Sequence, residues 1–343
     1  MRWRKCCKKT ARRANPSHAV LLLLVAFLGT RAFAQETTLH SQSNIVLIPA
    51  LVKDSDGGIV YGLHAKDFIV EDDGVEQTVQ LDEAPEGQPV SLVIAVQRGR
   101  RASYEFPRMQ GLGSMIEPII GQGQARVALV EFDSQVEIVR NFTKDSSLIF
   151  DDLRNLQAGD NGAAILDAVD SAISLLEKEP ENRLRVLLLI SETRDHGSHV
   201  AKVEEVVSKI GKSKSVIYAL AFSPTLSNIL DTARGNNKSE MHNGIDFIDL
   251  AYQLAQAMRK NIPSTIAGMT GGEYELFATR KKFDGRMSDF TNHLHSRYLL
   301  NIQPKSPHAG PHQIRVRLRS GGSDSVLARS SYWAEAQEVT KPE

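Results

Sequence analysis

Three side chains that could bind a metal or move a proton lie close together in one short segment. Asp195, His196 and His199 form a D-H-x-x-H pattern shortly after an apolar run. Carboxylate and imidazole are zinc ligands, and a histidine beside a carboxylate can act as a general base. The pattern has only two imidazoles and lacks an H-E-x-x-H motif, so a solvated loop is favoured over a zinc or hydrolase site. His293 and His295, near a predicted helix end, are expected to be surface residues.

Other patterns typical of catalysis are weak in this sequence. There is no G-x-S-x-G nucleophile elbow. Two G-x-G pairs, at 111–113 and 121–123, do not directly follow a buried strand and open a helix, as a dinucleotide-binding loop requires. Both cysteines, Cys6 and Cys7, lie in a segment that we expect to be removed. We therefore expect no catalytic residue, disulfide, resident metal or cofactor.

Residues 1–34 have the pattern of a secretory signal. They hold eight basic residues and no acidic one, an apolar run at 19–29, and Ala32 and Ala34 in an A-x-A arrangement, which predicts cleavage after Ala34. The apolar run is shorter than the roughly 20 residues that span a bilayer, so a membrane anchor is disfavoured. The whole chain has 41 Lys+Arg and 41 Asp+Glu, so the exported part carries a net charge of −8. The expected export and the negative net charge both disfavour nucleic acid as a partner.

The strand expected at 91–97 is the centre of the predicted fold. Its apolar, partly β-branched run is typical of a parallel sheet covered on both faces. Ligands of open α/β sheets bind outside the carboxyl ends of the strands. The loop 97–101 is therefore the expected place of a site.

From 89 to 279 strands alternate with amphipathic helices, which predicts a doubly wound α/β domain. The expected strands are 91–97, 125–132, 136–141, 184–192, 215–223 and 273–278, and the expected helices are 113–120, 146–156, 164–177, 201–210 and 247–261. The strands on either side of Asp133 and Ser134 should form an antiparallel pair. The polar segment 224–244, rich in Asn, Ser and Gly, is expected to be a mobile insertion.

Strand-rich segments flank this domain on both sides. After a linker at 35–43, residues 44–86 form short apolar runs with Asp- and Gly-rich turns between them, which predicts hairpins. A helix at 283–295 leads to a second β segment at 297–334, and a disordered tail follows at 335–343. Isolated hairpins are marginally stable, so we expect about four strands from the first segment and about three from the second to form one β-sandwich.

Seven motifs occur in an order and spacing typical of one family. They are VKDSDGGIVYGLHAKDFIVEDDG at 52–74, the strand at 91–97, NGAAILDAV at 161–169, LLLISETRDHGS at 187–198, TGGEY at 270–274, SRYLLNIQP at 296–304 and HQIRVRL at 312–318. On these motifs the chain resembles the von Willebrand factor type A (VWA) superfamily, and specifically the exported VWFA-related proteins common in acidobacteria. The resemblance covers nearly the whole chain after the signal and implies a Rossmann-like domain.

The resemblance also implies a metal-ion-dependent adhesion site, built from a D-x-S-x-S loop, a Thr and a second Asp. The corresponding residues are Gln97 for the first Asp, Gly99 and Arg101 for the two Ser, Ala163 for the Thr and Glu192 for the second Asp. Mg²⁺ requires hard oxygen ligands in near-octahedral geometry. These residues supply one carboxylate, one neutral amide and a fixed positive charge, so the site is degenerate and no metal is expected.

These observations favour a non-enzymatic, exported protein-binding or scaffold module, periplasmic or extracellular, over a hydrolase or metal-binding protein that uses the loop at 195–199. Arg98, Arg100 and Arg101 make the loop positive on an otherwise acidic protein. The expected partner is a protein with an acidic contact residue, because a guanidinium pairs with a carboxylate without a metal. We also expect Glu192 to lie close enough to Arg101 to form an ion pair.

Overall fold

The computed structural model describes residues 45–82, 88–121, 125–222, 247–304 and 307–335. Contacts divide the chain into two units, 1–43 and 44–343, and the described residues all belong to the second. The predicted signal, linker and insertion, and all but the first residue of the predicted tail, lie outside the described residues. In the described ranges, no helix combines the length and the apolar character needed to cross a membrane.

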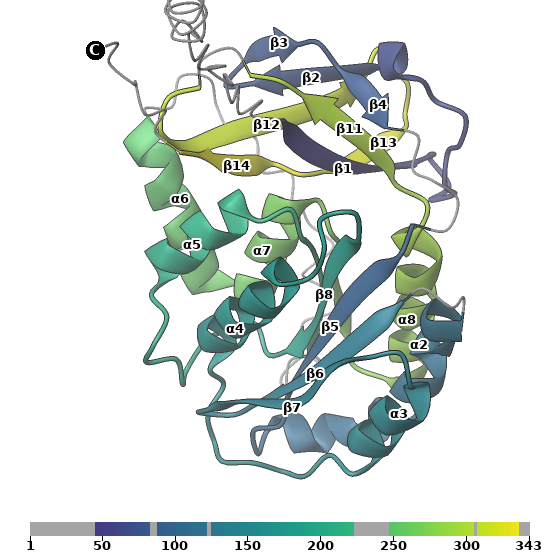
Figure 1. Cartoon of the computed structure of the whole chain (residues 1–343), viewed down its shortest axis with the longest axis vertical. Coiled ribbons are helices and arrows are strands. Elements are labelled where there is room, and N and C mark those ends of the chain that lie inside the picture. Colours follow the sequence, from purple (N-terminus) through teal and green to yellow (C-terminus); the bar gives the residue numbers. More distant parts are fainter. Residues whose placement is uncertain (1–44, 83–87, 122–124, 223–246, 305–306, 336–343) are drawn as a thin grey trace, which may run out of the picture. The chain divides into compact units, whose positions relative to one another are not determined.

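A six-stranded sheet forms the centre of the α/β domain (Figure 1), in the order β10-β9-β8-β5-β6-β7. Its strands are β5 (Val90–Gln97), β6 (Arg126–Phe132), β7 (Val136–Thr143), β8 (Leu184–Ser191), β9 (Val216–Phe222) and β10 (Tyr274–Phe277). All neighbours are parallel except β6 and β7, which form the predicted antiparallel pair. Every residue of β5 is buried, as the apolar run predicts for a strand covered on both faces.

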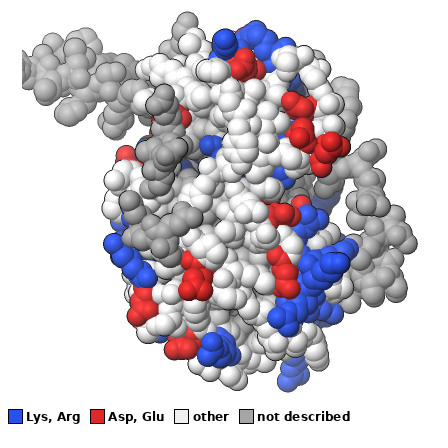
Figure 2. Space-filling model, turned by 90° about the vertical axis from the view of Figure 1, so that its right-hand side faces the viewer, with Lys and Arg blue, Asp and Glu red and all other residues white. Residues whose placement is uncertain are grey.

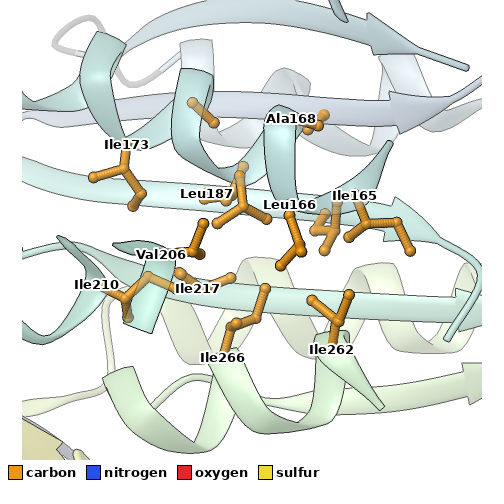
Figure 3. Close-up of a cluster of buried hydrophobic side chains, with 14 of the residues drawn as sticks. Ile165, Leu166, Ala168, Ile173, Leu187, Val206, Ile210, Ile217, Ile262 and Ile266 are labelled. Carbon is orange, nitrogen blue, oxygen red and sulfur yellow. The ribbon is translucent and has the colours of Figure 1, made fainter. Parts of the chain in front are cut away.

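Helices cover both faces of this sheet. They are α2 (Leu112–Gly121), α3 (Ser146–Arg154), α4 (Ile165–Glu177), α5 (Val203–Lys212), α6 (Phe247–Lys260), α7 (Ile262–Thr270) and α8 (Arg280–Leu294), with a 3-10 helix, η2 (Ala102–Arg108), after β5. Side chains alternate along β5, so Val93 packs with α4 to α7 and Leu92 packs with α2, α3 and α8. Figure 3 shows side chains of α4, α5 and α7 meeting β8 and β9. The predicted doubly wound fold is confirmed.

Helix α7 was not expected from the sequence. Pro263 interrupts the apolar pattern after α6, and a proline inside a helical pattern usually ends the helix. Here it lies at the start of a new helix, where its missing N–H is tolerated, and the Asn261 side chain caps that helix by accepting from Ser264 N.

The two flanking segments form one β-sandwich. Its strands are β1 (Val46–Lys53), β2 (Phe68–Asp72), β3 (Val75–Gln77), β4 (Gln80–Asp82), β11 (Tyr298–Ile302), β12 (Gly310–Leu318), β13 (Ser325–Ala328) and β14 (Ser331–Ala334). The sheets are β13-β1-β11-β4 and β14-β12-β2-β3, and their buried side chains share one apolar cluster. The predicted pairing of the two segments is confirmed. The expected strand at 325–333 is divided into β13 and β14, which lie in different sheets.

Arg329 lies at this crossing between sheets and connects the sandwich to α5. Its side chain is buried and donates to the carbonyl oxygens of Ile210, at 3.1 Å, and Gly211, at 2.8 Å, near the C-terminal end of α5. It also donates to the carbonyl of Ser331 at 2.8 Å. Burial lowers the pKa of Arg329 to about 10, so the guanidinium remains charged at neutral pH. A positive charge at a helix C-terminus is favourable.

Candidate functional site

Gln97 and Glu192 bind each other at the carboxyl edge of the sheet, where β5 and β8 end. Gln97 Nε2 donates to Glu192 Oε1 at 3.1 Å, and the backbone N–H of Glu192 donates to Gln97 Oε1 at 2.8 Å. Both residues are buried. The amide of Gln97 therefore uses its acceptor and one of its two amide hydrogens on Glu192.

His196 extends this pair toward solvent. Its Nε2 lies 3.3 Å from the second carboxylate oxygen of Glu192. Both oxygens of Glu192 therefore have partners within the protein. Together with the lack of side-chain oxygens at Gly99 and Ala163, this arrangement does not fit a hard divalent cation, which would need several free oxygen ligands.

Gly99 is held against a second loop, and this contact leaves no room for a side chain. A Cβ added at Gly99 would overlap the carbonyl oxygen of Gly162. On either side, Arg100 N donates to Asp160 O at 2.5 Å, and Gly159 N donates to Arg98 O at 2.8 Å. The loop after β5 is thus fixed by backbone hydrogen bonds to residues 159–162, and a serine at position 99 is excluded unless the backbone moves.

Arg98 faces inward and is neutralised by acidic residues of β6, β7 and their connection. Its guanidinium lies 3.1 Å from Asp133, 3.1 Å from Glu137 and 3.4 Å from Glu131. Burial opposes the charge of Arg98, but the Asp133 and Glu131 carboxylates raise its pKa above the ordinary value. Burial also raises the pKa of Glu131, in spite of Arg98. Arg98 therefore does not contribute to a positive surface, contrary to the sequence-based expectation.

Arg100 and Arg101 are exposed, and Tyr104 is 74% exposed in η2. The expected ion pair between Arg101 and Glu192 is absent from the described part of the chain, where the second carboxylate oxygen of Glu192 lies 3.3 Å from His196 Nε2. The expectation was wrong because the Gln97 side chain points inward and forms hydrogen bonds with Glu192. Ala163, the remaining predicted position, is buried, and its carbonyl accepts from His196 N at 3.1 Å.

The three side chains of the D-H-x-x-H pattern have different partners. Asp195 caps α4 by accepting from Leu166 N at 3.0 Å, and it also binds the Ser198 hydroxyl. His196 faces Glu192. The ring of His199 is exposed, and its Nδ1 lies 2.9 Å from the carbonyl oxygen of Gly197. Within the described residues, no hydrogen bond or ion pair joins any two of these three side chains. The arrangement is that of a loop held by a helix cap.

Asp167, which the sequence analysis did not single out, organises the same loop. This buried carboxylate accepts from the backbone N–H groups of His199 at 3.1 Å, Val200 at 3.3 Å and Ala201 at 2.6 Å. An acidic residue in the first turn of a helix is usually explained by the helix dipole. Its role toward residues 199–201 therefore had no separate signal in the sequence.

A family model matches part of the chain. It is the model of the von Willebrand factor type A domain, and it matches residues 98–198. No curated protein matches the sequence.

Several solved structures are similar at low identity. The vWF domain of the type V pili tip protein Mfa5 from Porphyromonas gingivalis has 16% identity and a TM-score of 0.29; the match covers 31% of this chain and 38% of that chain. The conserved hypothetical protein BatB from Bacteroides thetaiotaomicron has 15% identity and a TM-score of 0.40, over 60% and 98%. The PilB minor pilin from Streptococcus sanguinis has 12% identity and a TM-score of 0.42, over 62% of each chain.

Proposed function

We propose that this protein is an exported, non-enzymatic binding module of the von Willebrand factor type A kind, which contacts a protein partner without a metal. The observation that carries the proposal is the mutual hydrogen bonding of Gln97 and Glu192. In the family that the chain resembles, these two positions carry ligands of a cation. Here they satisfy each other, so recognition at this edge has to use other groups.

The groups that remain on this edge are of the types that dominate protein interfaces. Arg101 precedes η2 as its cap and Tyr104 is three residues further on, and side chains three apart in a 3-10 helix lie above one another. Arginine and tyrosine are enriched among residues that contribute most to binding. With Arg100, they form a positive, aromatic surface that suits a partner carboxylate.

A second exposed loop follows the adjacent strand β8. Val200 is 75% exposed, and its backbone N–H is held by Asp167. A loop fixed by a buried carboxylate presents its side chains with little loss of conformational freedom on binding. We infer that Val200 provides an apolar contact beside the arginines, since β5 and β8 are neighbours in the sheet.

Charge distribution supports a protein partner over nucleic acid. On the face drawn in Figure 2, the largest group of basic side chains lies at the lower right with acidic side chains next to it, smaller basic groups lie at the left, bottom and top, and many surface side chains are uncharged. A long basic stripe, such as a nucleic-acid backbone would follow, does not cross the described part of this face. The separate contacts of Asp195, His196 and His199 give no support to the hydrolase alternative.

Site-specific photocrosslinking tests this proposal. A photoreactive phenylalanine derivative replaces Tyr104 in one variant and Tyr252 of α6, which is 61% exposed, in a matched control. Crosslinking in the envelope fraction of the source organism should capture a defined partner from position 104 and not from position 252.

The affinity of the captured partner then decides which groups bind. Arg101→Ala and Arg101→Ser should weaken binding about 5- to 30-fold at physiological salt, and more at low salt, because a surface charge pair is screened by ions. Arg280→Ala, on α8, is the matched surface control. Unchanged affinity for both Arg101 variants at both salt concentrations would exclude this loop as the contact surface.

A further inference from the structure

Two aspartates and two histidines from distant parts of the chain meet in the β-sandwich. Asp72 ends β2 and Asp73 follows it in the turn to β3, while His308 precedes β12 and His312 lies in it. Ligand atoms of Asp73, His308 and His312 all lie within 4.8 Å of one another. Within the described ranges, this is the one group of three or more His, Cys, Asp or Glu residues that is close enough to share a metal ion.

The separations within this cluster are close to those of a tetrahedral site. His312 Nδ1 lies 3.3 Å from Asp72 Oδ1 and 2.7 Å from Asp73 Oδ2, and His308 Nε2 lies 3.4 Å from the same Asp73 oxygen. Four ligands about 2.0–2.1 Å from a zinc ion are about 3.4 Å from one another. Two of the three distances match, and the short one has to open by about 0.7 Å when an ion enters.

The hydrogen bonding of His312 leaves one ring nitrogen facing the two carboxylates. His312 Nε2 lies 2.9 Å from the carbonyl oxygen of His308, so the N–H at Nε2 donates to that oxygen and Nδ1 can carry the lone pair. His312 is 2% exposed and Asp72 is 7% exposed, and His312 Nδ1 faces Asp72 Oδ1 at 3.3 Å with neither atom in a well-aligned hydrogen bond. Buried polar atoms without a partner are rare. Acceptor atoms that face one another need a positive charge between them, which a metal ion or a proton on Nδ1 can supply.

Neighbouring groups orient these ligands. The Tyr332 hydroxyl donates to the other oxygen of Asp72 at 3.0 Å, and its ring stacks on His312 with centroids 4.6 Å apart. Asp73 has a φ of 48° in a tight Asp-Gly turn, and its second oxygen accepts from Gln313 N at 2.9 Å. Such outer partners are typical of metal ligands, because they fix the direction of the lone pairs.

The cluster is accessible through a cavity of about 520 Å³, which all four residues help to line. Its wall also carries the polar side chains of Gln77, Gln80 and Asn301. An ion can therefore enter from solvent.

We propose that Asp73, His308 and His312, with Asp72, bind a divalent transition-metal ion of the Zn²⁺ class. Two imidazoles favour Zn²⁺, Co²⁺ or Ni²⁺ over Mg²⁺ and Ca²⁺, which prefer oxygen ligands. His308, now stacked on His312 at 3.8 Å, tilts to direct Nε2 at the ion. The ion links the β2–β3 turn to the start of β12, and so joins the N- and C-terminal β segments.

Metal titration of the purified protein, prepared without a polyhistidine tag and treated with EDTA, tests this site. Calorimetry with Zn²⁺ and the visible absorption of Co²⁺ measure stoichiometry, affinity and geometry. The variants are His308→Gln and Asp73→Asn, since asparagine tolerates the positive φ of Asp73. The matched control is His64→Gln, which removes an exposed histidine paired with Asp67 at 3.6 Å elsewhere in the sandwich region.

We expect one equivalent of Zn²⁺ to bind with a tetrahedral Co²⁺ spectrum, and both site variants to weaken binding at least about 10-fold, while the control is unchanged. Millimolar Mg²⁺ should not compete. If the native protein shows no saturable Zn²⁺ binding, or if both site variants bind as the native protein does, the proposal is overturned and a proton shared by His312 and the carboxylates accounts for the cluster.

Discussion

Lys53 and Glu273 form an ion pair between the β-sandwich and the α/β domain, with Lys53 Nζ 2.6 Å from Glu273 Oε1. The other oxygen of Glu273 lies 2.8 Å from Nδ1 of His293. His293 was expected to be a surface residue, but it is buried at the end of α8, whereas His295 is exposed as expected. The sequence pattern does not distinguish a helix end that packs against a neighbouring strand from an exposed helix end.

The charge of Glu273 should make the free energy of unfolding depend on pH in the acid range. Burial alone would raise its pKa, but hydrogen bonds from His293 and Lys53 lower it to about 2. A carboxylate with a depressed pKa stabilises the folded state above its unfolded pKa, and this contribution is lost as pH falls from about 4.5 to about 2. Urea unfolding should show Glu273→Gln losing up to about 3 kcal/mol at pH 7 and much less at pH 3. Glu204→Gln, in an exposed pair with Arg259, is the control; an equal loss for Glu273→Gln at both pH values would contradict the prediction.

Millimolar Mg²⁺ or Ca²⁺ should not raise the melting temperature through the sheet edge. A ligand that binds only the folded state adds about 2.7 kcal/mol at one hundred times its Kd. Gln97 and His196 already occupy the oxygens of Glu192, so this contribution should be missing. Scanning calorimetry with and without the ion measures it. A saturable rise with Mg²⁺ that Glu192→Ala abolishes would show that the edge binds a cation after all.

Introducing a serine at position 99, the residue type that the resemblance implies there, should destabilise the protein. Gly99→Ser places a Cβ against the carbonyl oxygen of Gly162, a backbone atom that cannot rotate away. We expect a loss of about 2–4 kcal/mol in urea unfolding. Gly285→Ser in α8 is the matched control, because nothing lies within 4 Å of a Cβ there, and it should be neutral or slightly stabilising. Equal stability of the two variants would mean that residues 159–162 shift easily.

Arg329 should contribute more to stability than an exposed arginine of the same sandwich. Arg329→Met keeps much of the buried volume but removes hydrogen bonds to three carbonyl groups, so we expect a loss of about 3–5 kcal/mol in urea unfolding. Arg315→Met on β12, where the arginine side chain is 45% exposed, should cost at most about 1 kcal/mol. A loss below about 1 kcal/mol for Arg329→Met would show that the connection to α5 does not depend on this residue.

The α/β core could be predicted from the sequence because burial leaves a direct mark on composition. Strands covered on both faces need continuous apolar runs, and β5 and β8 have them. The pairing of the two flanking segments followed from their need to cover an apolar face. The division of the last expected strand did not follow, because a two-residue crossing at Arg329 and Ser330 has no characteristic turn sequence.

The details of the site were harder to predict, since they depend on which way neighbouring side chains point. Arg98, Arg100 and Arg101 are the same residue type in one short loop, yet among the three only Arg98 turns inward, to Asp133. The expectation that the edge lacks a set of metal ligands rests on residue types only, and it stays a prediction. The cluster of Asp73, His308 and His312 could not be predicted, because its members come from opposite ends of the chain.

The pairing of β1 with β11 and β13 also determines the order in which the protein can fold. Val46 pairs with Ile302, and Ala50 with Ala328, so β1 cannot pair until β11 and β13 have been synthesised. Contacts so distant along the chain make folding slow, and an unpaired strand edge is prone to aggregation in the meantime. The inserted α/β domain can assemble earlier, and in doing so it brings the ends of its two connections together. In a newly synthesised chain, the N- and C-terminal β segments would therefore pair last.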